Sequence, residues 1–400
     1  MSLSLSINGK PYNLWETASL RRSLDNNCGE YSFTTSSDIP KTAYPVKAGS
    51  KADVFVDGLR RASGYIDTIR VQESEGSHSI TCEGRDSLQD LIDSSVPDNA
   101  KVTKGPVTLK NLCELVLNSL TLGVKIKVMD WVGNLEPFTS EELSASESAN
   151  KCMQYLVSFA RKRQVYLVSM AGPKVEYLMI YRPTFLDKSS TPLIHKLNNP
   201  TNNVLSYTLK VSEAERFSSY LCRSQNNLSM PVPLADKTTK VDLSNEIIDD
   251  YPRKSRYLEI QAEETMFTNN LLDRAIEEKN IRKALGTLYT CTVQGHSQSN
   301  GVPWDFGQFV TINDDFAGMR GSYLIKEVEF TVDTQRGGRT KLTCCPPDGY
   351  STISSTTPQI EKLAVQPFTS LPIESRAFQL GRYDEFIKGT YRDWGRLPLE

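Results

Sequence analysis

Hydrophobic and polar residues alternate from the first positions of the chain. Leu3, Leu5 and Ile7 point one way and the serines between them the other, which is the period of a half-buried strand. Asn8-Gly9 then supplies a tight hairpin turn. The alternation continues through five more short stretches, at residues 18–24, 29–35, 51–58, 63–72 and 78–84. Six short strands with no helix among them predict an antiparallel barrel or sandwich over residues 1–97, ending in a brief helix after Arg85.

The period changes over residues 98–196. Apolar residues at helical spacing behind Thr108 predict a capped helix, and residues 124–128 alternate as a strand. A second amphipathic helix, with Ser146 as its expected cap, carries Met153, Leu156, Val157 and Ala160 on one face. Two strands joined by a turn at Gly172-Pro173 follow it. We predict a small α+β middle domain here.

Strands return at residues 197–228 and again at residues 286–349. Residues 229–285 break the pattern with two prolines, a polar and acidic stretch, and one amphipathic helix. The simplest interpretation is a second barrel interrupted by an inserted domain with one helix. The predicted fold is therefore mainly β with α+β insertions.

Two distant stretches resemble one another. "KAGSKADVFVDGLRRASGYIDTIRVQES" starts at Lys47, and "WDFGQFVTINDDFAGMRGSYLIKEVEFTVD" starts at Trp304. In each, a glycine leads an alternating strand, an acidic turn follows, and a second strand opens. This echo predicts that one fold is used twice in the chain.

The composition changes again in residues 350–400, where a Ser/Thr-rich linker precedes a segment in which aromatic residues alternate with arginines. Tyr, Trp and Arg are enriched at the centres of protein interfaces. The segment therefore holds candidate partner-docking residues, the alternative being that it packs on its own chain. The candidates are Phe378, Arg382, Tyr383, Phe386, Tyr391, Arg392 and Trp394.

Bulk properties are those of an ordinary globular protein, with 38% hydrophobic and 24% charged residues in 400. A formal net charge of -2 gives no global field that would attract DNA or an anionic membrane. No apolar run approaches the ~18 residues of a membrane-spanning helix, and the N-terminus lacks a signal-peptide pattern, so we expect no membrane insertion and synthesis in the cytoplasm. Eight cysteines are scattered along the chain, and five of them, Cys82, Cys113, Cys152, Cys222 and Cys291, lie in apolar strand-like or helix-like patterns and are expected to be small buried hydrophobes.

No catalytic, cofactor-binding or metal site is predicted. His78, His195 and His296 have no Cys, Asp or Glu at ligand spacing, and the common hydrolase and phosphate-loop signatures do not occur. Three adjacent carboxylate pairs fit solvated turns or helix caps better than a catalytic pair. They are Glu141-Glu142, Asp249-Asp250 and Asp314-Asp315. Small arginine clusters after Leu20, Gly58 and Ala160 fit solvated faces and a helix end.

Three stretches resemble a known family. They are "SLSINGKPYNLWETASLRRSLDNNCGEYSF", "SGYIDTIRVQESEGSHSITCEGRDSLQDLIDSS", which is close to the family pattern GYID…GRD…DLVD, and the strand pairs from Tyr289 to "LTCCPPDGY". The family is that of the baseplate hub proteins of contractile phage tails, the Mu-like tail protein P group. The resemblance covers roughly residues 3–350, with "VPWDFG" as a modest departure.

The resemblance implies that the two barrels are tail-tube-like modules. Three copies would form a ring of six similar barrels, a pseudo-sixfold homotrimer that joins the sixfold tail tube to the threefold central spike and lets phage DNA pass. It further implies contact with the spike, a tail tube or tube-initiator protein, the tape-measure protein and other baseplate proteins. The expected location is the virion tail baseplate, after assembly in the host cytoplasm.

Two other functions remain open from the sequence. The α+β middle region loosely resembles small peptidoglycan-binding modules, which would make the chain a wall-binding or wall-active tail component. An ordinary carbohydrate-active β-protein would need a cleft with convergent carboxylates.

Overall fold

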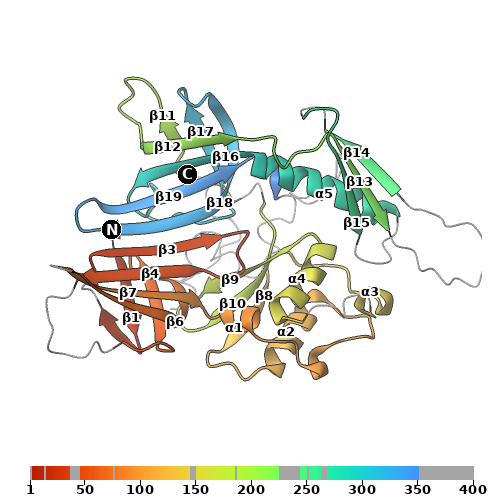
Figure 1. The fold of residues 1–400 in the computed structure, drawn as a ribbon, viewed down its shortest axis with the longest axis horizontal. Helices are drawn as coiled ribbons and strands as arrows, with labels where there is room; N and C mark the ends of the chain where they lie inside the picture. The colour runs from red at the N-terminus through yellow and green to blue at the C-terminus, as the bar shows by residue number, and fades with distance from the viewer. Residues whose placement is uncertain are drawn as a thin grey trace, which may run out of the picture.

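The computed structural model describes residues 2–12, 15–36, 46–74, 77–144, 150–184, 187–224, 244–249, 252–262 and 268–350. Within these ranges most strands join one large sheet, and two three-stranded sheets stand apart from it. In Figure 1 the N-terminal strands and the C-terminal strands lie next to each other, with the middle unit and an inserted unit on one side. The fold is mainly β, as predicted.

The first module contains the strands of residues 3–86, in the spatial order β3-β4-β7-β6-β5-β1-β2. Its side chains alternate between buried and solvent-facing, as in β1 and β5, which confirms the predicted strands. Asn8 and Gly9 both adopt positive φ, as the predicted hairpin turn requires. The strands are β1 (Leu3–Ile7), β2 (Lys10–Tyr12), β3 (Thr17–Ser23), β4 (Glu30–Ser36), β5 (Lys51–Val56), β6 (Leu59–Ser74) and β7 (Ser77–Asp86).

The second module repeats this strand order. Its strands follow one another as β12-β16-β19-β18-β17-β11, where β11 pairs parallel to β17. The strands are β11 (Leu193–His195), β12 (Val204–Val211), β16 (Thr287–Gln294), β17 (Phe309–Asp314), β18 (Met319–Asp333) and β19 (Gly337–Cys345). The two stretches that echo each other in the sequence are therefore the hairpins β5-β6 and β17-β18.

The two modules are joined edge to edge within one sheet. β18 pairs antiparallel with β3, from Glu327 opposite Ser23 to Asp333 opposite Thr17. Leu20 and Phe330 are directly opposite each other in this pairing and both are fully buried. One hydrophobic cluster spans both modules, so the contact between them belongs to the core.

The middle unit packs helices on a small sheet of order β8-β10-β9 and has its own hydrophobic cluster. Thr108 caps α2 as predicted, since its hydroxyl accepts from the Asn111 amide at 3.2 Å. The prediction of Ser146 as a helix cap was wrong, because α4 begins at Cys152 and its N-cap is Lys151. The elements are α1 (Gln89–Asp93), η1 (Asp98–Ala100), α2 (Leu109–Ser119), β8 (Ile126–Asp130), α3 (Ser140–Ser144), α4 (Cys152–Lys162), β9 (Tyr166–Ala171) and β10 (Glu176–Tyr181).

The inserted unit consists of a second small sheet and the helix α5 (Thr268–Gly286). The sheet order is β14-β13-β15, formed by β13 (Ser219–Ser224), β14 (Ser244–Ile248) and β15 (Tyr257–Ala262). The sequence pattern had assigned residues 197–228 to the second module, but β13 hydrogen-bonds to β14 and β15. We therefore propose that the insertion runs from β13 to the end of α5. The described chain closes with the short helix η2 (Pro347–Gly349).

The five cysteines predicted to be buried are buried, and the other three, Cys28, Cys344 and Cys345, are buried and free as well. In the described part of the chain, no helix has the length and apolar composition needed to cross a membrane.

Candidate assembly surfaces

A buried ionic contact connects the two modules. Asp305, in the loop before β17, accepts hydrogen bonds from Arg22 of β3 at 2.8 Å and from Arg61 of β6 at 3.1 Å. Arg22 is almost fully buried, and its other terminal nitrogen donates to the carbonyl oxygen of Ser169 in β9 at 3.0 Å. One carboxylate and two guanidiniums thus hold three parts of the chain together. Charge-assisted hydrogen bonds of this kind are stronger than neutral ones.

The loop that carries Asp305 depends on its local sequence. Trp304 and Phe306 are buried on either side of the aspartate. Gly307 has a φ of 82°, and a Cβ added there would overlap the Tyr181 side chain. Only glycine combines this left-handed conformation with such a close approach. The stretch "VPWDFG", noted above as a departure from the family pattern, is therefore the anchor of the second module on the first.

A second buried charge cluster lies between the first module and β10. Arg60 contacts both Asp53, at 2.8 Å, and Glu176, at 2.5 Å. Burial raises the pKa of Glu176 to about 7, although the Arg60 guanidinium lowers it in part. Glu176 is buried and shares the Arg60 cation with Asp53. A carboxyl group in such a place keeps its proton to a higher pH than an exposed carboxyl group does.

Asp86, the last residue of β7, forms the third polar contact with the middle unit. Its carboxylate accepts from the amides of Gly29, at 2.6 Å, and Leu88, at 3.1 Å, and from the hydroxyl of Ser169. Burial raises the pKa of Asp86, and these hydrogen bonds counteract that rise. The middle unit is therefore fixed to the first module by hydrogen-bonded, buried polar groups.

The end of the described chain is also fixed. Lys326 lies at a bulge in β18 and is buried, with its ammonium 2.5 Å from Asp25 and 3.3 Å from the Tyr350 hydroxyl. Tyr350 in turn donates to Asp25 and packs on the Tyr166 ring at 5.6 Å. The chain thus enters residues 351–400 from a buried position between the first module, the second module and β9.

Several arginines and carboxylates are not where the sequence predicted. Arg22, Arg60 and Arg61 were expected on solvated faces, but they are largely buried in the ion pairs just described. Asp314 was expected in a solvated turn, yet it is fully buried and accepts from the Tyr289 hydroxyl at 2.7 Å. Glu142 does cap its helix, since it accepts from the Thr139 amide at 2.9 Å. An ionic residue that pairs inside a protein has the same sequence signature as one on the surface.

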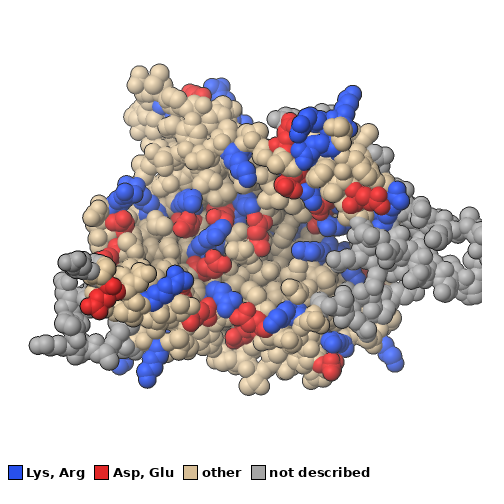
Figure 2. All heavy atoms as spheres, in the orientation of Figure 1, with Lys and Arg blue, Asp and Glu red and all other residues tan. Residues whose placement is uncertain are grey.

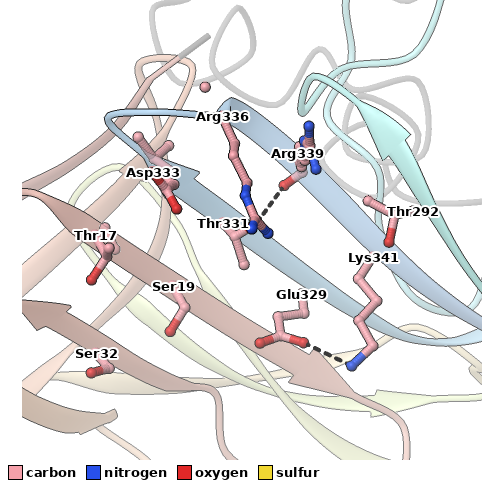
Figure 3. Close-up of a pocket in the computed structure, with 13 residues that line it drawn as sticks. Thr17, Ser19, Ser32, Thr292, Glu329, Thr331, Asp333, Arg336, Arg339 and Lys341 are labelled. Carbon is pink, nitrogen blue, oxygen red and sulfur yellow. Dashed lines mark hydrogen bonds and ion pairs between the residues drawn. The ribbon is translucent and has the colours of Figure 1, made fainter. Parts of the chain in front are cut away.

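The outer face of the continuous sheet is polar across the junction of the modules. Side chains of β3, β4, β16, β18 and β19 surround an open hollow of about 440 Å³, and Glu329 and Asp333 lie there among Arg336, Arg339 and Lys341 (Figure 3). Lys341 is 3.4 Å from Glu329, and next to the hollow Arg21 is 2.8 Å from Glu327. Figure 2 shows basic and acidic side chains interspersed over the visible face of the molecule. This face carries both signs of charge and many Ser and Thr hydroxyls.

The candidate docking residues of the C-terminal segment, from Phe378 to Trp394, lie outside the described residues. Of the three histidines, His195 contacts Asp314 at 3.2 Å and His296 contacts the carbonyl oxygen of Thr331 at 3.0 Å. Among the residues that the structure describes, no group of three or more His, Cys, Asp and Glu is arranged to hold a metal ion.

Comparisons with known proteins bear on this arrangement. Residues 2–86 match the family model of the Mu phage baseplate assembly protein GpP-like, N-terminal domain. The chain is 21% identical over 351 residues to the baseplate hub protein gp44 of Escherichia phage Mu, covering 87% of this chain and 89% of that protein.

Solved structures share the fold over most of the chain. The 43 kDa tail protein of prophage MuSo2 from Shewanella oneidensis has a TM-score of 0.71 at 23% identity, covering 87% of this chain and 98% of that one. A tail protein from Neisseria meningitidis MC58 also has a TM-score of 0.71, at 18% identity, with 88% and 98% covered. The resemblance of this chain to the Mu-like baseplate hub proteins is thereby confirmed.

Proposed function

We propose that this protein is a structural hub of a contractile phage baseplate. Three copies form a ring in which six similar sheet modules surround a channel, so that one side of the ring matches a sixfold tail tube and the other a threefold central spike. The repeated strand order, β3-β4-β7-β6-β5 and β12-β16-β19-β18-β17, carries this proposal. A duplicated module in a closed trimer presents pseudo-sixfold symmetry.

The way the modules are fixed supports the proposal. They are held in one orientation by a continuous sheet and by the Arg22–Asp305–Arg61 contact, so the chain behaves as a rigid pair. The middle unit is tied to that pair by Asp86 and Glu176. A ring component that must keep its geometry under load needs this kind of rigidity. Such a role uses no chemistry, and we propose no catalytic residue and no cofactor.

We propose that the polar outer face of the sheet lines the channel. Two cations of this face are paired with carboxylates, in Arg21–Glu327 and Lys341–Glu329. A wall with paired charges has little net attraction for phosphate, whereas a wall of unpaired Lys and Arg would bind DNA through counterion release. DNA could then slide past without being held.

The partners that we propose are the spike, a tail tube or tube-initiator protein, the tape-measure protein and other baseplate components. Docking of the spike is assigned to residues 351–400, with Phe378, Tyr383, Tyr391 and Trp394 as anchors. The fixed position of Tyr350 gives this 50-residue segment a defined starting point on the hub. Truncation after Tyr350 should abolish spike binding and leave self-association intact. Unchanged spike binding and infectivity would refute this assignment.

The decisive experiment is the mass of the purified protein in solution, by light scattering after size exclusion, with and without a candidate spike. We expect a species of about 134 kDa, three times the 44.8 kDa of one chain, alone or with the spike. A persistent monomer under both conditions would overturn the ring. Binding of the whole chain to purified cell wall would then be tested, because a wall-binding middle unit is the second candidate from the sequence.

A further inference from the structure

The two modules can be compared residue by residue at one bulge. Ile66 of β6 pairs with Gly84, and the pairing then skips one residue, Asp67. Ile325 of β18 pairs with Cys344, and the pairing then skips Lys326. The bulges coincide in the two hairpins, so the half of β6 after Asp67 corresponds to the half of β18 after Lys326.

These two half-strands have different neighbours. The outer edge of β18 from Glu327 to Asp333 is covered by β3. Among the described residues, no strand pairs with the same edge of β6 over residues 68–73. As a result Val71 is 59% exposed, whereas Phe330, at the equivalent position, is fully buried.

In the same way, β12 of the second module corresponds to β3 of the first module. Leu20 of β3 is opposite Tyr31, which is opposite Gly84, and Leu209 of β12 is opposite Tyr289, which is opposite Cys344. Residues 206–212 thus correspond to residues 17–23. The outer edge of β3 is covered by β18, but in the described part of the chain no strand covers the outer edge of β12, where Val211 is 57% exposed.

We infer that β12 of one copy pairs antiparallel with β6 of the next copy, repeating between chains the contact that β3 makes with β18 within one chain. This inference rests on the proposed function, since it requires copies of the chain to associate. In the described part of each chain both halves of the contact are uncovered, so a second copy is the occupant that fits each edge. Exposed edges left unpaired are a risk for uncontrolled association, and a closed ring removes them.

The equivalence fixes the register. Phe330 is opposite Leu20 within the chain, which places Val71 opposite Leu209, and Val328 opposite Arg22 places Ile69 opposite Val211. The two most exposed apolar residues of these strands, Val71 and Val211, are thereby covered. Arg70 is placed opposite Lys210, and Glu83, 3.0 Å from Arg70, offsets the repulsion between the two cations.

Cysteine cross-linking tests this register. Gln72 and Thr208 are exposed and take the places of Thr331 and Ser19, which are opposite each other. Directly opposed residues in an antiparallel pair are close enough for a disulfide. The full chain with Gln72→Cys and Thr208→Cys should form covalent dimers and trimers under mild oxidation. Single variants, and Gln72→Cys combined with Lys10→Cys on the far edge strand β2, are the controls. The eight native cysteines are buried and should not form disulfides between chains.

Charge insertion gives an independent test. Val71→Asp and Val211→Asp alter residues that are exposed in the single chain, so the fold should persist, as circular dichroism would verify. We expect each to lower the trimer fraction at least tenfold at fixed concentration. Ile248→Asp, at a 65% exposed residue of the inserted unit, should leave the trimer fraction unchanged.

The outcomes separate the two proposals. A trimer that forms but neither cross-links through Gln72→Cys and Thr208→Cys nor responds to the aspartates would overturn the strand pairing and leave the ring standing. A wild-type chain that stays monomeric with and without the spike would overturn both.

Discussion

The two sheet modules share a strand order and a bulge, and they differ in what the bulge holds. In the first module the bulged residue, Asp67, pairs with Arg85 of its own sheet at 2.8 Å, in a partly exposed place. In the second module the bulged residue, Lys326, is buried and reaches Asp25, which follows β3 of the first module, and Tyr350. The bulged residue therefore makes a contact within its own module in the first case and a contact between the modules in the second. Only the bulge of the second module thus takes part in the contact between the modules.

The largest effect is expected at the anchor that only the second module has. Asp305→Ala leaves Arg22 and Arg61 without their shared carboxylate in a buried place, which should lower the free energy of unfolding by about 3–5 kcal/mol. Urea denaturation followed by tryptophan fluorescence would measure it. Asp315→Ala removes an exposed pair with Arg320 and serves as the control. Equal midpoints for the two variants would show that the anchor is dispensable.

The bulges themselves offer a matched pair. Lys326→Ala removes a buried ammonium from Asp25 and Tyr350, and we expect a loss of about 2–3 kcal/mol. Asp67→Ala breaks a partly exposed ion pair and should cost less than about 1 kcal/mol. Both are measured by the same denaturation. A larger loss for Asp67→Ala would reverse the assignment of roles to the two bulges.

The stability of the protein should depend on pH through the contact between the first module and the middle unit, where Glu176 is buried beside Arg60. Because the folded pKa of Glu176 is about 7 and its ordinary value is 4.5, its contribution to stability is complete below pH 4.5 and is lost as pH rises through 7. The wild type should therefore lose about 1–2 kcal/mol more than Glu176→Gln between pH 5 and pH 7.5. Parallel pH profiles for the two proteins would contradict this.

The smallest change in stability is expected in β6, whose outer edge after Asp67 is covered by no strand among the described residues. Arg70→Ala removes a pair with Glu83 in which both side chains are substantially exposed, and it should change monomer stability by less than about 0.5 kcal/mol. Glu327→Ala, on the covered strand β18, should cost more, since its side chain is mostly buried beside Arg21. Thermal melts of both variants would check the order.

The local sequence patterns predicted where the helices and strands lie better than they predicted which strands pair with one another. Alternation marked β1 and β5, and helical spacing with Thr108 marked α2, because burial on one side of an element leaves a periodic trace in the sequence. The same alternation marked β13 but could not show that it belongs to another sheet, since period 2 is independent of which strand lies alongside.

The ionic anchors were not predictable in the same way. Arg22 and Asp305 are 283 residues apart, and neither has a local pattern that sets it apart from a surface charge. The sequence feature that could have indicated a buried Asp305 is "VPWDFG", where two apolar aromatics flank the aspartate and a glycine follows. Aromatic residues around a charge in a short loop indicate that the loop is packed inward.

The pairing of β3 with β18 also has a mechanical consequence. Its hydrogen bonds run across the strands from Glu327 to Asp333. A force directed along these strands loads all the bonds of the joint at once, whereas a force that peels the strands apart breaks them one after another. Tension parallel to β3 and β18 is therefore the direction in which the two halves of the chain resist separation best, and a pull at right angles to them within the sheet is the direction in which they yield first.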